Sequence, residues 1–382
     1  MTRNPAYEVV VVGGGPAGLT TALYTTRLGH RTALVDREGG RYESVASVHN
    51  LLGVSEDASG HEVSELAIDQ LDEYGVDFYR DGVREIERVG ENAESGDDET
   101  AKSRDFENAA DEDDQFRVTA DSVDLLADRV VLATGFEDVP PRVRGLRRFV
   151  GRGLHYCLHC DAYTLGDEPV FALGHGDDAA EVAMVMLNFT DDVDLLLDDE
   201  ESEWSDETRE QVETHPVTVV EDRVDHAFAA EESHHGSGEE SERTPEDAWL
   251  GGLEFAEGHR REYTGGFAVY GTEYNTDLAA DLGCDLADDG AIIVGENRET
   301  SVPGVYAVGD VTHGQNQTPI AIGDGAYAGI ALHKDLRTFP VPADELDRIP
   351  DLDVPAMADD LRARMWRVRE ADEHAGMTPE KR

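Results

Sequence analysis

The 382-residue sequence contains few cysteines and no long hydrophobic run. Only three cysteines are present, which excludes a small secreted domain held together by several disulfides. The longest apolar runs, such as residues 9–12, have the length of a single strand, and no secretory signal is visible. We therefore expect a cytoplasmic protein that has no membrane partner.

Basic residues are also scarce. Lysine and arginine number 32 against 84 aspartates and glutamates, so the formal net charge at pH 7 is -52. This balance excludes nucleic acid as a partner, because the phosphate backbone would be repelled. The acidic residues are spread along the chain instead of forming one patch. They indicate adaptation to concentrated salt, as in the cytoplasm of an extreme halophile, rather than binding to a basic partner.

The hydrophobic residues make up 39% of the chain, enough for two cores, and the first opens with a dinucleotide-binding pattern. A valine-rich strand at 7–12 is followed by the loop Gly13-Gly14-Gly15-Pro16-Ala17-Gly18 and a helix at 17–28. The glycines let the backbone approach a pyrophosphate, and the helix N-terminus offers amides to it. Asp36 ends the next strand and can bind a ribose 2′-hydroxyl.

A second fingerprint, G-x-G-x-x-A from Gly174 to Ala179, lies between a strand and a helix predicted at 180–188. The strand after that helix ends at Asp198. An acid there suits a free 2′-hydroxyl and repels a 2′-phosphate, so this unit should prefer NADH to NADPH. The alternative is a site without ligand, because His175 is bulky and several aspartates crowd the loop with negative charge.

Cys157 and Cys160 form a Cys-x-x-Cys motif on a turn that should enter a helix. Two thiols at this spacing can close a small disulfide ring. A helix N-terminus lowers a thiol pKa, so the pair can pass between disulfide and thiolate near neutral pH. Asp161 can move a proton on and off the departing thiolate. A cationic His159 would favour the thiolate further and make the disulfide more oxidising.

Two other interpretations of the cysteine motif remain open. With His155 and His159 the motif could form half of a zinc site. A structural zinc site needs four ligands, usually from a second pair, whereas Cys284 stands alone and histidines in adjacent turns cannot easily all face one metal. Two inert buried thiols are the other interpretation. The redox pair explains more of the chain, and we expect no metal site.

Three further segments are polar or punctuated by proline. Residues 90–115 and 231–247 are acidic and poor in aliphatic side chains, which predicts loosely held insertions. Prolines between 340 and 355 mark an extended linker to an amphipathic helix at 356–370. The apolar stripe of that helix should pack on the body of the protein or on a second subunit.

Taken in order, these motifs resemble the thioredoxin reductase family of FAD-dependent pyridine nucleotide-disulfide oxidoreductases over residues 7–335. The matching motifs are Gly13 to Gly18, Ala133-Thr134-Gly135, Cys157 to Asp161, Gly174 to Ala179 and Gly309-Asp310. The resemblance implies an α/β fold with two Rossmann-like three-layer dinucleotide-binding domains, the second inserted into the first. It also implies FAD as cofactor and a homodimer.

The resemblance further implies the domain bounds and binding residues. Residues 1–140 and 272–335 would form the discontinuous FAD-binding domain, residues 141–271 the inserted NAD(P)-type domain with the cysteine pair, and residues 336–382 a C-terminal extension. The candidate flavin-binding residues are Gly13, Gly15, Pro16, Ala17, Gly18, Asp36, Arg37, Gly40, Arg41, Asn50, Ala133, Thr134, Gly135, Gly309, Asp310, Gln317, Thr318 and Pro319. The candidates in the nicotinamide site are Gly174, Gly176 and Asp198.

In the family mechanism, hydride passes from the nicotinamide to the flavin, and the reduced flavin opens the disulfide. Carried over to this chain, Cys160 is the flavin-side thiol and Cys157 attacks the substrate disulfide. Asp161 protonates the nascent thiolate. The substrate would be a thioredoxin-like protein or a small-molecule disulfide.

The chain departs from the family pattern at two places near the cofactors. Leu197-Asp198-Asp199 replaces the basic triplet that binds the 2′-phosphate, which disfavours NADPH, and Gly39-Gly40-Arg41 replaces Gly-Gly-Gln. Two alternatives follow. One is a dithiol oxidase that passes electrons from a small dithiol through FAD to oxygen, and the other is a flavoprotein redox sensor that does not turn over.

Overall fold

The computed structural model describes residues 6–37, 40–89, 115–230, 248–343 and 359–376. The chain divides into two compact units: unit 1 comprises residues 1–136 and 274–382, and unit 2 comprises residues 137–273. The predicted insertions fall outside the described residues, except for Gln115. The same holds for Gly39, for most of the proline-rich linker and for residues 356–358, where the sequence predicts the start of the last helix.

Unit 1 is built on a seven-stranded sheet with the order β3-β2-β1-β6-β5-β4, and β17 also pairs with β6. The strands are β1 (Ala6–Val12), β2 (Thr32–Asp36), β3 (Asp77–Arg80), β4 (Val83–Val89), β5 (Gln115–Ala120), β6 (Asp124–Leu132) and β17 (Val305–Ala307). Strands β1, β2, β3, β6 and β17 are parallel, whereas β4, β5 and the start of β6 form an antiparallel meander. The sequence predicts a buried strand over residues 129–135, and the pairing with β5 explains why β6 begins earlier, at Asp124.

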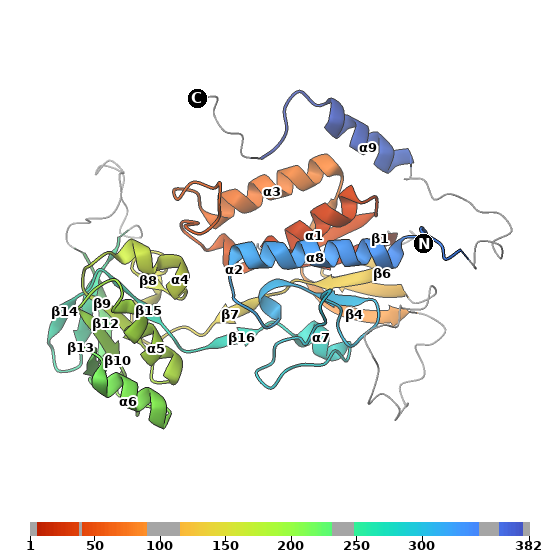
Figure 1. Ribbon diagram of the computed structural model, residues 1–382. Coiled ribbons are helices and arrows are strands. Elements are labelled where there is room, and N and C mark those ends of the chain that lie inside the picture. The colour runs from red at the N-terminus through yellow and green to blue at the C-terminus, as the bar shows by residue number, and fades with distance from the viewer. Residues whose placement is uncertain (1–5, 38–39, 90–114, 231–247, 344–358, 377–382) are drawn as a thin grey trace, which may run out of the picture. The chain divides into compact units, whose positions relative to one another are not determined.

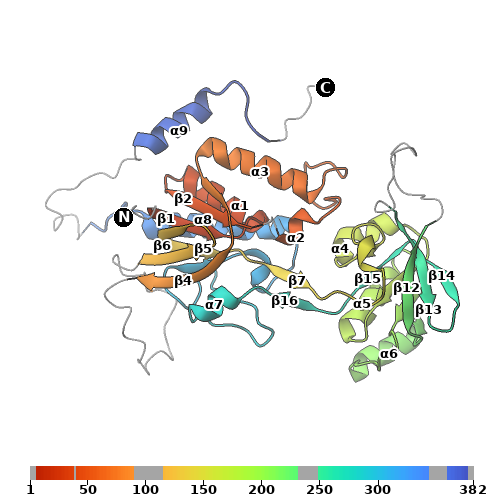
Figure 2. The ribbon, with the colours of Figure 1, turned by 180° about the vertical axis from the view of Figure 1, so that it is seen from behind.

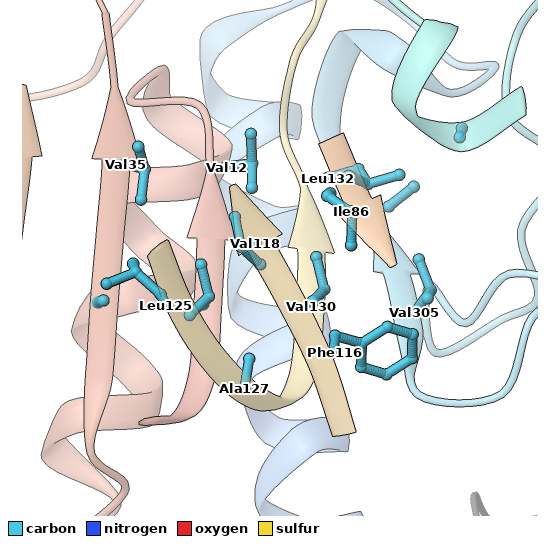
Figure 3. Packing of buried hydrophobic residues seen from close by; sticks show 14 of the residues in the cluster. Val12, Val35, Ile86, Phe116, Val118, Leu125, Ala127, Val130, Leu132 and Val305 are labelled. Carbon is cyan, nitrogen blue, oxygen red and sulfur yellow. The ribbon is translucent and has the colours of Figure 1, made fainter. Parts of the chain in front are cut away.

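Side chains alternate along β1 and so separate two hydrophobic cores. Val9 and Val11 pack with α1 (Pro16–Arg27), α3 (Gly60–Tyr74) and α8 (Thr318–Leu336), which cover one face of the sheet in Figure 1. Val10 and Val12 pack with the meander and with α7 (Asp277–Asp281) on the other face. Figure 3 shows this second core around Phe116. Unit 1 is therefore a three-layer structure.

Helices α1 and α8 run side by side in the same direction. A Cβ atom at Gly325 would lie 2.2 Å from the backbone oxygen of Ala17, so only glycine permits this approach. Just past the end of α1, His30 Nε2 lies 3.0 Å from Nδ1 of His333 in α8. The shared direction brings the N-termini of both helices to the same end of the sheet.

The C-terminal helix α9 (Asp359–Glu370) packs on α3, as Figures 1 and 2 show. Leu361 is buried there, and the Arg364 guanidinium donates to the carbonyl of Gly75, which ends α3. The backbone N–H of Ala375 donates to Glu73 Oε1 at 2.5 Å. The extension therefore rests on unit 1 itself.

Unit 2 holds a parallel five-stranded sheet with the order β11-β10-β9-β15-β8. Its strands are β8 (Leu154–His155), β9 (Val170–Leu173), β10 (Val193–Leu196), β11 (Thr218–Val220) and β15 (Gly265–Ala268). Helices α5 (Asp177–Met186) and α6 (Asp206–Thr214) cover one face. The antiparallel strands β12 (Val224–Ala229), β13 (Leu250–Phe255) and β14 (Arg260–Glu262) cover the other (Figure 2).

Two short strands, β7 (Phe136–Asp138) and β16 (Thr272–Tyr274), pair where the chain leaves and re-enters unit 1. The predicted α/β class, with two three-layer units and the second interrupting the first, is confirmed. Helix α5 starts at Asp177 and not at the predicted residue 180, because it begins directly at the glycine fingerprint. In the described part of the chain, no helix is both long and apolar enough to span a bilayer.

Candidate active site

The first glycine loop leaves an open helix N-terminus at the end of β1. Gly15 is the N-cap of α1, no side chain caps the helix, and a Cβ atom at Gly15 would meet nothing within 4 Å. The first turn of α1 carries no acidic residue. Gly13 has a φ of 110°, and a Cβ atom there would lie 2.2 Å from the oxygen of Ala133. The loop is thus held tightly against the end of β6, and the uncapped N-terminus of α1 beside Gly15 is open, as an anion site requires.

Asp36 lies beside this loop at the end of β2. The backbone N–H of Gly14 donates to Asp36 Oδ1 at 2.7 Å. Two further candidate flavin-binding residues, Arg37 and Arg41, contact other groups. The Arg37 guanidinium lies against the backbone of Gly82, and the Arg41 guanidinium lies over the Phe136 ring at 4.9 Å. Arg41 belongs to the short helix α2 (Gly40–Glu43), which Gly40 begins.

Segments far apart in the sequence meet at the same end of the sheet. Asn50 Nδ2 donates to Gln317 Oε1 at 2.8 Å, and Gln317 is the N-cap of α8, which begins with Thr318 and Pro319. Strand β17 is followed by the 3-10 turn Gly309–Val311, which contains Asp310. Because β1, β2, β6 and β17 are parallel, the residues after each of them share one edge.

One residue at this edge was missed by sequence reasoning. Asn275 Nδ2 donates to the carbonyl of Thr134 at 3.0 Å, and Thr134 Oγ1 donates to the carbonyl of Asn275 at 2.7 Å. The two bonds lock the Ala-Thr-Gly strand end to the chain that re-enters unit 1. Asn275 stands outside the recognisable motifs, so no local pattern could have identified it.

In unit 2, Cys157 and Cys160 form a disulfide with a Cα–Cα distance of 5.3 Å. Cys157 is the N-cap of α4 (Leu158–Asp161), and the backbone N–H of Cys160 donates to Cys157 Sγ at 3.1 Å. Helix α4 is a single turn, so its dipole is weaker than the predicted helix would provide. The same amide can stabilise a thiolate at Cys157 once the disulfide opens.

Asp161 pairs with His155, to which the sequence analysis gave no part in the redox chemistry. His155 Nδ1 lies 3.1 Å from Asp161 Oδ2, and both side chains are largely buried. His159, between the cysteines, is exposed, so water screens its charge and weakens its predicted effect on the thiolate. Cys284 is buried in unit 1, where burial raises the pKa of its thiol. It therefore takes no part in this centre.

The second fingerprint shares the backbone geometry of the first. A Cβ atom at Gly174 would lie 2.4 Å from the oxygen of Val269, and Gly176 is the N-cap of α5 with nothing within 4 Å of a Cβ atom. Here, however, Asp177 and Asp178 occupy the first turn. Asp177 Oδ1 accepts the backbone N–H of Ser205 at 2.8 Å, and this bond helps to lower the pKa of Asp177, so its charge persists at the helix N-terminus.

Asp198 turns its carboxylate toward the protein. Its Oδ1 accepts the backbone N–H of Val224 at 2.7 Å, its φ is 56°, and burial raises its pKa. It lines an open pocket at the end of β10 together with Arg142, Arg144, Asp199, Glu200, Arg223, Val224 and Asp225. Arg144 and Asp225 form an ion pair at 3.0 Å in this pocket.

Comparison with known proteins supports the resemblance. A family model described as pyridine nucleotide-disulphide oxidoreductase matches residues 7–325. The F-type subunit of alkyl hydroperoxide reductase in Staphylococcus aureus is 28% identical over 333 residues, which cover 85% of this chain and 58% of that protein. The corresponding protein of Pseudomonas putida is 29% identical over 350 residues, covering 90% and 61%. The chain therefore spans about three-fifths of the length of these curated relatives.

Solved structures show the same fold. The crystal structure of HlmI is 28% identical, with a TM-score of 0.73, and the match covers 88% of this chain and 94% of that one. Thioredoxin reductase from Streptococcus pyogenes MGAS5005 is 23% identical, with a TM-score of 0.73 and coverage of 88% and 100%. Because the family model covers most of the chain, the protein belongs to the pyridine nucleotide-disulphide oxidoreductase family, as the motifs predicted.

Proposed function

We propose that the protein is an FAD-dependent thiol–disulfide oxidoreductase. Electrons pass from a reduced nicotinamide through FAD and the Cys157–Cys160 disulfide to a thioredoxin-like protein or a small disulfide. The observation that carries this proposal is the disulfide at the N-cap of α4, next to Asp161, in a chain with an open glycine loop in unit 1. A structural disulfide would need neither feature.

The residues of unit 1 fit FAD. The open N-terminus of α1 suits the pyrophosphate, and Asp36, held beside the loop by Gly14, suits a ribose hydroxyl. Asn50 and the N-terminus of α8 lie at the same edge of the sheet and would contact the remainder of the cofactor. When bound, FAD supplies the two-electron carrier between the nicotinamide and the disulfide.

The cysteine pair has two separate roles in this proposal. Two electrons break the S–S bond and leave two thiolates. Asp161 then gives a proton to the thiolate of Cys160. The Cys157 thiolate, which accepts the amide of Cys160, attacks one sulfur of the substrate disulfide and displaces the other as a thiolate. Cys160 then displaces the second substrate thiol and restores the internal disulfide.

The proposed electron donor is NADH rather than NADPH. The pocket after β10 contains three arginines but four acids, so a 2′-phosphate would meet net negative charge. Replacing both Asp198 and Asp199 with arginine should raise the use of NADPH relative to NADH. An unchanged ratio would count against this pocket as a nucleotide site.

A second candidate function is dithiol oxidation, in which a small dithiol reduces the disulfide, electrons pass to FAD and oxygen accepts them. The acidic first turn of α5 favours this candidate, because Asp177 and Asp178 oppose a pyrophosphate at that helix. His175 adds bulk between the two glycines of the same loop. In that case unit 2 serves as the scaffold of the cysteine pair.

The deciding experiment follows flavin bleaching in an anaerobic stopped-flow instrument, in concentrated KCl because of the net charge of -52. The FAD-loaded protein is mixed separately with NADH, NADPH and dithiothreitol. Fast bleaching by NADH supports the reductase. Bleaching by the dithiol alone, reversed by oxygen, supports the oxidase. Cys157→Ser and Cys160→Ser should each abolish disulfide turnover and keep the flavin, whereas full turnover by either variant would refute the assigned pair.

The proposal includes a homodimer located in the cytoplasm. Helix α8 exposes three large apolar side chains, Ile320 at 41%, Tyr327 at 62% and Ile330 at 42%, which suit a contact with a second copy. Light scattering at several KCl concentrations tests this part. A monomeric mass at all of them would exclude the dimer. Adaptation to concentrated salt stays a prediction from composition.

A further inference from the structure

His155 is a buried histidine beside the redox centre. Its side chain is 6% exposed, and it lies on β8, where it pairs with Phe267 of β15 and contacts the Phe267 ring at 5.9 Å. A buried imidazole needs a polar partner to offset its desolvation. The partner is Asp161, whose Oδ2 lies 3.1 Å from His155 Nδ1.

The other ring nitrogen indicates which tautomer is present. Nε2 is buried and has no hydrogen-bond partner among the described residues. A proton on Nε2 would be a buried donor without an acceptor, which is costly, whereas an unprotonated nitrogen loses less. The proton therefore belongs on Nδ1, which lies 3.1 Å from Asp161 Oδ2, within donating distance.

The position of Asp161 on the turn links this bond to the sulfurs. Asp161 follows Cys160 directly and lies four residues after Cys157, and residues four apart share one side of a helical turn. With Oδ2 held by His155, Oδ1 is the oxygen that would carry the transferable proton. The bond thus limits the rotation of the one acid that the proposed mechanism uses.

Strand β8 and helix α4 carry this pair, and β15 pairs with β8. Within the described residues, the ion pair of His155 is with Asp161. Helix α4 contributes Cys157, His159 and Cys160, and the side chain of His159 is exposed. The described part of β15, which pairs with β8, contains no titratable side chain.

We propose that His155 is a positioning residue for Asp161 in proton transfer to the cysteine pair, an inference that rests on the proposed function. When two electrons break the S–S bond, the Cys160 thiolate takes the proton from Asp161 and leaves a carboxylate. The Nδ1–H of His155 stays on the ring and donates to that carboxylate, which stabilises it. The proton returns to Asp161 from solvent.

Two variants with similar side chains test the role. In His155→Asn the amide nitrogen takes the place of Nδ1, so the bond to Asp161 is retained. In His155→Gln the amide nitrogen takes the place of Nε2, so the bond is lost. The rate of flavin reduction by dithiothreitol is measured anaerobically against pH on the FAD-loaded protein, and reduction by NADH serves as an independent half-reaction.

We expect His155→Gln to slow the dithiol half-reaction about tenfold or more, the scale of a lost acid–base contribution. Its pH profile should differ from that of the unsubstituted protein, because the acid has lost its hydrogen-bond donor. His155→Asn should stay within about threefold of the unsubstituted protein and keep its pH profile. In the double variant His155→Gln/Asp161→Asn, the rate should match Asp161→Asn alone, since the two side chains act as one unit.

The inference is overturned if Gln and Asn variants are slowed equally, if neither changes the profile, or if the His155 and Asp161 effects multiply. Retained flavin and an unchanged second half-reaction show that a variant is folded. If the unsubstituted protein exchanges no electrons between dithiol and flavin, the proposed function fails and the inference falls with it. If that exchange occurs but the His155 variants leave it unaltered, the inference alone fails.

Discussion

The two glycine fingerprints of this chain have nearly the same backbone and opposite electrostatics. In each, the first glycine packs against a carbonyl after a neighbouring strand, with Cβ distances of 2.2 Å at Gly13 and 2.4 Å at Gly174. In each, the third residue is an open N-cap. The first helix turn is free of acids in α1, whereas α5 begins with Asp177 and Asp178.

The acids that follow the second strand of each unit also differ. Asp36 accepts an amide of its own glycine loop, from Gly14, and so lies where a ribose would bind. Asp198 accepts the amide of Val224 in another strand and is partly buried. A shared motif therefore specifies the shape of a loop, while the charges around it decide which ligand the loop can hold.

The largest expected effect shows which of the two glycine loops holds FAD. Gly13→Ala forces a Cβ atom against Ala133 at a φ of 110°, a strain of about 1–3 kcal/mol before the clash is counted. We expect this variant to be purified without flavin colour. Gly174→Ala has the matching clash in unit 2 and should stay yellow. The flavin absorbance per protein measures the FAD content of both variants. Equal loss of flavin from the two would show that the loops do not differ in the ligand they hold.

The next prediction gives the first residue of α1 the negative charge that α5 carries there. Pro16 and Asp177 are the first residues of α1 and α5. Pro16→Asp should weaken FAD binding about tenfold, because a carboxylate at the helix N-terminus opposes the pyrophosphate. Pro16→Asn is the neutral control for shape. Fluorescence titration of the apoprotein with FAD measures the affinity, and equal losses for Asp and Asn would exclude a charge effect.

The converse change should help the second site. Asp178→Asn removes an exposed charge from the first turn of α5 and is expected to tighten NADH binding about threefold, more at low salt than at high salt. Glu181→Gln, one turn further along α5, should change it less because the dipole effect fades within a turn. The NADH dependence of the bleaching rate gives the affinity. No response to Asp178→Asn would favour a second site without ligand.

The smallest effect concerns Asp198 and stability. Burial raises the pKa of Asp198 in the folded protein, so the folded state holds its proton more tightly than the unfolded chain does. This contribution is present at acid pH and is lost as pH rises through the folded pKa. Asp198→Asn should therefore raise Tm by about 1–2 °C at pH 7, and the gain should vanish at about pH 4. Calorimetry at both pH values checks the sign.

Much of the fold and part of the site could be predicted from local patterns. The strands around Val9 and Val131 and the helix after Gly15 follow from short-range hydrophobic periodicity and glycine placement. The disulfide follows from the spacing of Cys157 and Cys160. The sequence predicts strands at 83–89 and 116–120 but not their pairing in the meander, and it predicts none of β12, β13 and β14, because such pairing depends on residues distant in sequence.

The class of protein can be identified from the amino-acid sequence alone, because glycine loops, a Cys-x-x-Cys pair and buried strands are local signals with direct chemical meaning. The contacts between side chains distant in sequence follow from the folded structure. There Asn275 donates to the carbonyl of Thr134, Asp198 accepts the amide of Val224, and His155 lies beside Asp161. These contacts depend on strand register and on the direction of individual side chains, which residue type and spacing do not encode.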